Sequence, residues 1–208
     1  MILAEQDAAL FYRAWDALLV WVNERRKVVP PFPLPTPGHP IAPELVAKIR
    51  DVLWADDGLR EQFLAEGAAG LGAAERALID SWKHRASAKF VIYSHMKKHS
   101  IFMSDAVYGV RGIFTPLEVM FPFLPIFAEA VLLPFQDVII TDGLLTTPPM
   151  QMTFGGGIRR MFKNQYSTAR DAGQVRTQLP WIAGAEIPIL PVRKSLARRT
   201  TRRRRTPR

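Results

Sequence analysis

The feature that most limits the possible folds of this chain is a change in hydrophobic pattern at Ala88. Up to residue 87, apolar residues recur at the spacing of amphipathic helices. From residue 88 to 154 they form about six short runs bounded by turn residues. This change predicts an α+β fold, in which a helical region (1–87) precedes an antiparallel β unit (88–179). The sheet is expected to have about six strands or to close into a small barrel.

Helices are expected over residues 5–27, 42–54, 59–66 and 74–86, where apolar residues follow a 3.6-residue period. In the first of them, acidic residues come near the start, and Arg25, Arg26 and Lys27 near the end, as the helix dipole favours. Trp15 and Trp21 are expected to be core or interface residues. The helical region has no residue pattern that indicates catalysis.

Residues 30–43 include prolines at seven of fourteen positions. Proline lacks a backbone donor and fixes φ, so the segment is excluded from a helix or a central strand and is expected to be an extended connector. Two roles are open for it. The segment lies against its own domain, or it docks into an aromatic groove of a protein partner.

Strands are expected over 90–95, 100–103, 107–113, 127–133, 138–141 and 150–154, and residues 175–179 form a further edge strand or a docked segment. Lys97 and Lys98 fall in the first turn. Asp142 and Gly143 are a common turn dipeptide, and we expect a turn there. A C-terminal helix is expected over 156–172, with Gly173 as its stop.

The candidate ligand site is the turn that contains Gly155, Gly156 and Gly157, between the last expected strand and this helix. Glycines allow positive φ and close approach of a ligand, and a helix N-terminus favours an anion. Basic side chains follow in the first turns: Arg159, Arg160 and Lys163. The arrangement suggests a phosphate cradle. Alternatively, the glycines make a tight turn and the basic residues a solvated face, because the spacing matches neither the dinucleotide nor the P-loop pattern.

Two further sets of residues are candidate metal ligands. Asp142 would be the carboxylate beside a magnesium-bound nucleotide at the glycines. His95 and His99, with His84 as a third ligand, would form a metal site, but Lys97 and Lys98 between them would repel a cation. We expect no metal, no cofactor and no catalytic residues, and a His- and Lys-rich turn that faces solvent or phosphate.

The net charge of +9 belongs to the C-terminus, because nine basic and no acidic residues occur from Arg193 onward. The preceding 192 residues are therefore formally neutral. Residues 180–208 are expected to be a linker and a disordered basic tail. Such a tail favours polyanions such as nucleic acid or an acidic membrane surface, or is a solubilising extension. The expected nucleic-acid contacts are Arg198, Arg199, Arg202, Arg203, Arg204 and Arg205.

The remaining composition narrows the class of protein. The chain of 208 residues has no cysteine, which excludes disulfides, thiolate metal sites and cysteine nucleophiles. No apolar run reaches the roughly 18 residues of a membrane span. Because Glu5 and Asp7 stand where an export signal carries basic residues, we expect a cytoplasmic location.

Four blocks of the β unit, V-Y-G-V, L-L-P-F, D-G-L-L and F-G-G-G-I-R-R, occur in this order between residues 80 and 180. In this respect the chain resembles a group of uncharacterised bacterial proteins. The resemblance implies that the blocks form one unit, and it implies no activity.

Three classes of function follow. The first is a non-enzymatic binding or regulatory module that contacts nucleic acid through its basic tail. The second is an enzyme or sensor that binds a phosphate-bearing ligand at Gly155, Gly156 and Gly157. The third is an assembly or partner protein whose proline segment and Trp-rich helix make the contact. We favour the first, because the chain shows no set of nucleophile, base and orienting group.

Overall fold

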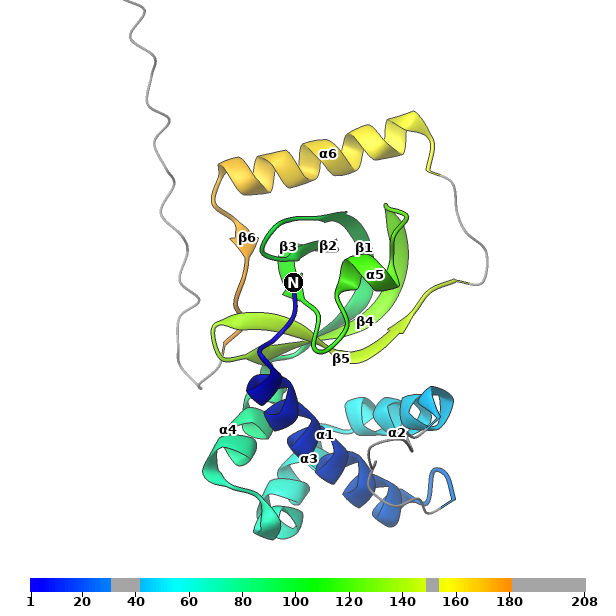
Figure 1. Cartoon of the computed structure of the whole chain (residues 1–208). Helices are drawn as coiled ribbons and strands as arrows, with labels where there is room; N and C mark the ends of the chain where they lie inside the picture. Colours follow the sequence, from blue (N-terminus) through cyan, green and yellow to red (C-terminus); the bar gives the residue numbers. More distant parts are fainter. Residues whose placement is uncertain (31–41, 149–153, 181–208) are drawn as a thin grey trace, which may run out of the picture.

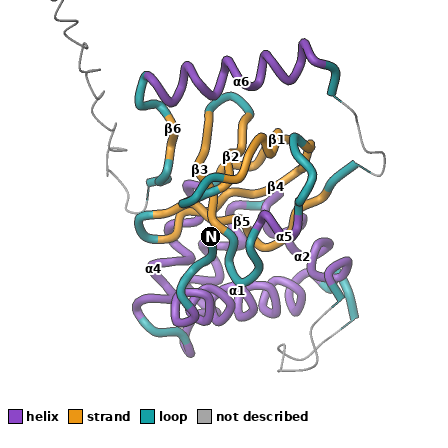
Figure 2. The backbone as a smooth tube through the Cα atoms, turned by 45° about the horizontal axis from the view of Figure 1, so that its top comes forward, coloured by secondary structure: helices purple, strands orange, loops and turns teal. Residues whose placement is uncertain are grey.

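The computed structural model describes residues 1–30, 42–148 and 154–180. They form an α+β structure, as predicted from the sequence. A helical region packs against one side of a small β-barrel, and the helix α6 lies across the opposite side (Figures 1 and 2). The Pro-rich connector (30–43) lies mostly, and the basic tail entirely, outside the described residues.

The helical region contains α1 (Glu5–Arg26), α2 (Pro43–Ala55), α3 (Asp57–Gln62) and α4 (Ala73–Ser81). Short π- and 3₁₀-helical turns continue α3 (Phe63–Gly67 and Ala68–Gly70) and α4 (Trp82–His84). Pro43 occupies the first turn of α2, where its missing N–H costs no hydrogen bond. Helix α3 begins at an Asp56 cap, whose carboxylate accepts from the Gly58 N–H at 3.0 Å.

The strands are β1 (Ala86–His95), β2 (Ser100–Met103), β3 (Val107–Arg111), β4 (Ile126–Phe135), β5 (Val138–Thr146) and β6 (Val175–Arg176). Their order is β2-β1-β4-β5-β3-β6, and an additional β2–β3 pairing closes the first five into a barrel. The short helix α5 (Leu117–Met120) connects β3 to β4.

The sheet is mixed and not wholly antiparallel as expected, because β3 pairs in parallel with both β5 and β6. The connection through α5 and β4 reverses the chain twice, so β5 returns beside β3 in the same direction. The sixth strand also differs from the expectation. Phe154, the last residue of the expected strand over 150–154, precedes α6 outside any strand, and residues 149–153 lie outside the described part of the chain. Residues 175 and 176 form the sixth strand instead.

Strand alternation divides the apolar residues into three clusters. Side chains such as Phe90, Ile92 and Phe102 fill the barrel interior. The alternate positions of β1 and β2, including Val91 and Ile101, face α6. On β4 and β5, a corresponding outward set packs on the helical region: Val131, Leu133, Phe135, Val138 and Ile140. Both faces of these strands are buried, which explains their nearly continuous apolar sequence.

The expected turn at Asp142 and Gly143 is wrong, because both residues lie inside β5. Gly143 has a φ of 86°, and the pairing register shifts on the facing strand between Ala130 and Leu132. The dipeptide therefore makes an irregularity within the strand, where glycine tolerates a φ that other residues avoid. The β4–β5 hairpin turns at Gln136 and Asp137, between the strands expected over 127–133 and 138–141.

Helix α6 (Gly156–Asp171) covers the outer face of β1, β2 and β3 and does not enter the barrel (Figure 2). Its one buried side chain is Phe162, and the Tyr166 ring lies 5.7 Å from that of Tyr93. The helix ends as predicted at Gly173, which has a φ of 68° and donates to the Arg170 carbonyl at 3.1 Å.

Candidate functional site

The predicted glycine cradle is the exposed N-terminus of α6. Gly155 precedes the helix with a φ of −63°, and Gly156 and Gly157 form its first turn. The expected positive φ is therefore absent at these glycines; among the described residues, glycine adopts it at Gly143 and Gly173. No atom lies within 4 Å of a Cβ added at any of the three. No side chain caps this helix start, so its N–H groups are open to solvent or to an anion.

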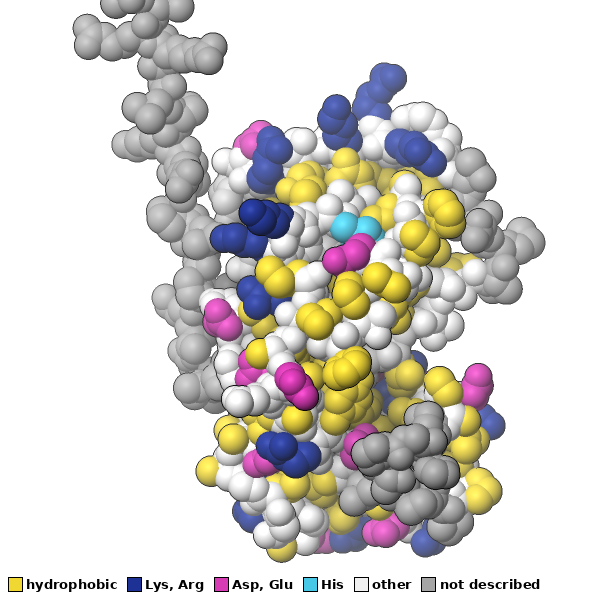
Figure 3. Space-filling model, in the orientation of Figure 1, with side chains coloured by type: hydrophobic (Ala, Val, Ile, Leu, Met, Phe, Trp, Pro, Cys, Tyr) yellow, Lys and Arg dark blue, Asp and Glu magenta, His cyan; other side chains and the backbone are white. Residues whose placement is uncertain are grey.

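The three basic residues predicted beside the glycines are exposed on α6. The Arg159 Nε donates to the Phe154 carbonyl at 3.2 Å, and the terminal nitrogens of the guanidinium have no partner among the described residues. Within the described ranges, Arg160 and Lys163 have no hydrogen bond or ion pair from their side chains. Arg170, farther along the helix, instead pairs with Asp171. Figure 3 shows Lys and Arg side chains gathered over α6 and hydrophobic side chains below them.

Asp142 does not belong to this site, contrary to the hypothesis of a metal-binding carboxylate. Its carboxylate is buried and accepts from Arg50 at 3.2 Å and from the Trp54 indole at 3.1 Å. Arg50 and Trp54 lie on α2, and α2 and α6 lie on opposite sides of the barrel (Figure 1). Burial raises the pKa of Asp142 to about 6, although Arg50 opposes this change. Asp142 therefore joins the helical region to the barrel.

His95 and His99, two of the three histidines considered as metal ligands, contact the protein itself. The His95 Nε2 lies 2.9 Å from the Phe121 carbonyl, and its Nδ1 lies 2.7 Å from the Ser100 Oγ. A carbonyl only accepts, so Nε2 carries the proton and Ser100 donates to Nδ1. His99 packs against Gly109, and burial lowers its pKa, with Arg111 and Lys98 acting in the same direction. In the described part of the chain, no three His, Asp or Glu side chains are placed to hold a metal ion.

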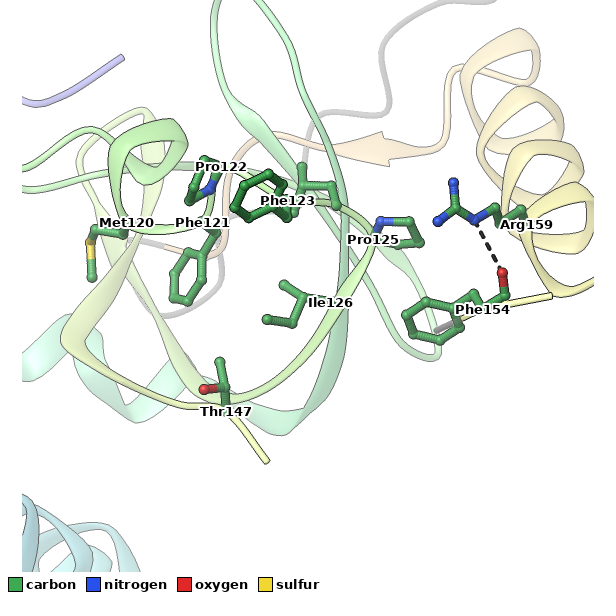
Figure 4. Close-up of a pocket in the computed structure, with 10 residues that line it drawn as sticks. Met120, Phe121, Pro122, Phe123, Pro125, Ile126, Thr147, Phe154 and Arg159 are labelled. Carbon is green, nitrogen blue, oxygen red and sulfur yellow. Dashed lines mark hydrogen bonds between the residues drawn. The ribbon is translucent and has the colours of Figure 1, made fainter. Parts of the chain in front are cut away.

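Sequence reasoning missed a pocket of about 340 Å³ beside the start of α6. It is lined by residues 120–126, which lead from α5 into β4, and by Thr147, Phe154 and Arg159. Figure 4 shows the Arg159 guanidinium at one end of the pocket and Phe121, Ile126 and Thr147 toward the other. The sequence signal was the motif F-P-F-L-P over 121–125, where prolines interrupt an apolar run and keep its aromatic side chains outside a regular strand.

The pocket wall is held by the half-buried His95. Because the His95 Nε2 donates to the Phe121 carbonyl, the segment that carries Phe121, Pro122 and Phe123 is tied to the end of β1. The same segment leaves Phe123 78% exposed at the rim. The hydrogen bond from His95 holds the backbone of the segment that carries the exposed Phe123 side chain, so the surface around this side chain has a defined shape.

The strand pairing defines the class of fold. Five strands close in the order β1-β2-β3-β5-β4, with β3 and β5 parallel, which is a Greek-key barrel of the OB type. In other proteins such barrels bind oligonucleotides or oligosaccharides on the face of the second and third strands. Here Phe154 and Phe162 pack on that face, against residues that include Ile101, Met103 and Val107.

No family model matches the chain, and the comparisons with curated proteins and with solved structures found no match. The resemblance to uncharacterised bacterial proteins stays a prediction. The four blocks that carry it lie on β3, on β4 and β5, and at the start of α6, which all belong to the barrel and its covering helix. No helix among residues 1–30, 42–148 and 154–180 is long and apolar enough to cross a bilayer.

Proposed function

We propose that this protein is a non-enzymatic module that binds nucleic acid through the basic surface of α6, together with its basic tail. The observation that supports the proposal is that Arg159, Arg160 and Lys163, on an exposed helix, have no acidic partner among the described residues. Cations without a protein partner remain available to phosphate groups, and the release of counterions then drives binding.

The positions of these cations suit a phosphate backbone. Arg159 and Lys163 stand four residues apart, so they project from the same side of α6 and are separated by about 6 Å along its axis. Arg159 lies at the end of the first turn, where the helix dipole adds positive potential, and Lys163 lies about one turn farther along. The six predicted tail arginines, from Arg198 to Arg205, lie outside the described residues and would extend the contact. The barrel type does not by itself decide the function, because one fold hosts many functions.

The non-enzymatic part of the proposal rests on the Ser–His contact described above. Ser100 and His95 lie within hydrogen-bonding distance, as in a nucleophile–base pair. Ser100 is only 3% exposed, and both His95 nitrogens are bonded to the protein. A substrate cannot reach this hydroxyl, and the imidazole has no free nitrogen for proton transfer.

A second candidate function is the binding of a small phosphate-bearing ligand at Gly155, Gly156 and Gly157. The uncapped, exposed start of α6 favours it, because a phosphate would accept from the free N–H groups. Thermal stabilisation of the chain by inorganic phosphate or nucleotides, lost in Arg159→Gln, would support this candidate. An unchanged melting temperature with every phosphate compound would remove it.

The principal test is fluorescence anisotropy of the full-length chain with a short labelled RNA over a range of salt concentrations. Replacing Arg159, Arg160 and Lys163 together by Gln should weaken binding at least 10-fold. It should also reduce the slope of the logarithm of the binding constant against the logarithm of the salt concentration by about 2, because each lost phosphate contact contributes roughly 0.7. A matched control replaces Lys27, Lys48 and Arg76 in the helical region and removes the same charge.

A third variant changes Arg198, Arg199, Arg202, Arg203, Arg204 and Arg205 to Gln within the full-length chain. Under the proposal, the α6 and tail variants each weaken binding and the control does not. Equal effects of the α6 and control variants would contradict a specific role of α6. Equal affinity for anionic lipid vesicles and for RNA would contradict a preference for nucleic acid and would indicate that the chain binds acidic surfaces in general.

A further inference from the structure

The surface beside the proposed nucleic-acid contact is aromatic and apolar. Phe123 is 78% exposed and Met120 is 42% exposed, and both line the pocket at the start of α6. An exposed phenylalanine lowers the solubility of a protein, and no residue in the described chain covers the Phe123 ring. Such a side chain at the rim of a pocket is suited to stack on a flat apolar ring.

We propose that this pocket receives an unpaired base of a single-stranded nucleic acid whose backbone lies along α6. The inference rests on the proposed function and specifies its ligand as a single strand. Arg159 connects the two surfaces, because its guanidinium lies at the end of the pocket and also belongs to the basic side of α6 (Figure 4). A phosphate paired with Arg159 would place the adjacent base over the pocket.

The lining of the pocket matches a base in shape and polarity. A cavity of about 340 Å³ accepts a ligand of small-molecule size. Phe121, Phe123 and Phe154 supply ring surfaces, and aromatic side chains stack on any base because each base has a π-face. Thr147, toward the end away from Arg159, has a hydroxyl with no hydrogen-bond partner in the described chain, and it can donate to or accept from a base edge.

A duplex does not fit the same surface. Its bases are stacked and paired, and one must leave the helix at a cost of a few kcal/mol before it enters a pocket. A strand that is already single avoids this cost. The face of β2 and β3 that OB-type barrels use is covered here by α6, whereas Phe123 is exposed at the pocket that Arg159 also lines.

The chemistry of the surface favours a nucleic acid over a protein partner. Among the described residues, Arg159, Arg160 and Lys163 have no acidic partner, and Arg159 lines the pocket together with the aromatic residues. A polyanion with flat rings complements both features at once. An apolar protein patch would leave Arg160 and Lys163 without partners. The basic tail alone contains no aromatic residue from Arg193 onward, so base stacking has to come from the folded part.

The test compares a labelled single-stranded RNA with the same sequence in a duplex, using anisotropy and the full-length chain. Phe123→Ala should weaken binding of the single strand about 10-fold and leave duplex binding unchanged, as expected for the loss of one stacked base. Phe123→Trp should restore the affinity. Phe114→Ala is the matched control, because Phe114 is 67% exposed and does not line the pocket.

A second readout places the fluorescent base 2-aminopurine in the single strand. Stacking on Phe123 should quench its emission on binding, and Phe123→Ala should reduce the quenching. Equal effects of Phe114→Ala and Phe123→Ala on binding, or equal affinity for single strand and duplex, would overturn this inference. The proposed function would still hold if replacing the basic residues of α6 weakens RNA binding.

Loss of the α6 charge effect would instead contradict the proposed function itself. Sedimentation of wild-type and Phe123→Ala chains tests the alternative that this surface binds another protein chain. Self-association that depends on Phe123, with unchanged RNA affinity, would identify the surface as a protein interface and overturn the inference.

Discussion

At the scale of single residues, the fold buries carboxyl groups in and beside the helical region. Asp142 is held by Arg50 and Trp54. Asp16 on α1 is half-buried and has no hydrogen bond or ion pair among the described residues. Burial raises the pKa of Asp16 to about 6, as it does for Asp142. Both groups bind a proton more tightly in the folded state than in the unfolded state, where the pKa is near 3.8.

The sign of the pH dependence follows from these pKa values. Both contributions are most favourable to folding below about pH 4 and become less favourable as the pH rises through about 6. Asp16→Asn should remove one of them and stabilise the protein at pH 7 by about 1 kcal/mol, after allowance for solvent screening. Urea denaturation at acidic and neutral pH measures this. Asp137→Asn, in an exposed turn, is the control, and an unchanged pH profile in Asp16→Asn would contradict the prediction.

At the scale of elements, α6 is amphipathic but contributes one buried side chain, Phe162, and its first turn contains Gly156 and Gly157. Glycine in a helix costs conformational entropy without a packing benefit, and here a Cβ would meet nothing within 4 Å. Packing therefore does not require glycine at these positions.

Gly156→Ala and Gly157→Ala should each stabilise the protein by about 0.5–1 kcal/mol, measured by urea denaturation. Gly143→Ala is the contrasting variant and should destabilise it by about 1 kcal/mol or more, because the φ of 86° at Gly143 is strained for alanine. Destabilisation by the two α6 variants would contradict this account of the helix start. Weaker phosphate binding despite greater stability would favour the second candidate function.

At the scale of the whole molecule, the helical region and the barrel share one apolar cluster. Leu18, Leu53 and Trp82 from the helices pack in the same cluster as Leu133 and Ile140 from the barrel. The Arg50–Asp142 ion pair crosses the same boundary. Neither part can separate without exposing this surface to water, so we expect the two to unfold together.

Thermal unfolding should therefore show one transition by every probe. Trp15, Trp21, Trp54 and Trp82 report on the helical region by fluorescence, whereas circular dichroism reports on helices and strands together. The midpoints of the two signals should coincide. A tryptophan transition that precedes the loss of strand signal would contradict the prediction. Ile140→Ala, in the shared cluster, should lower both midpoints together, through a loss of about 2–5 kcal/mol.

Much of the fold was predictable from local patterns. The short apolar runs of β1 and β2, the helical spacing of α1 and α6, and the stop at Gly173 each depend on residues close in sequence. The predicted boundary at Ala88 falls two residues after the start of β1 at Ala86. The basic residues of the candidate site were also identifiable, because Arg159, Arg160 and Lys163 follow a glycine-rich helix start.

The sequence by itself determined the α+β class, the positions of α1, α2, α4 and α6 and of β1 to β5, and the basic character of α6 and the tail. Only the tertiary structure decided that β3 and β5 pair in parallel, that Asp142 is buried against Arg50, and that residues 120–126 form a pocket with Arg159. Asp142 and Arg50 are 92 positions apart in sequence. A local pattern encodes backbone conformation and which faces are apolar, whereas such contacts depend on how distant elements pack together.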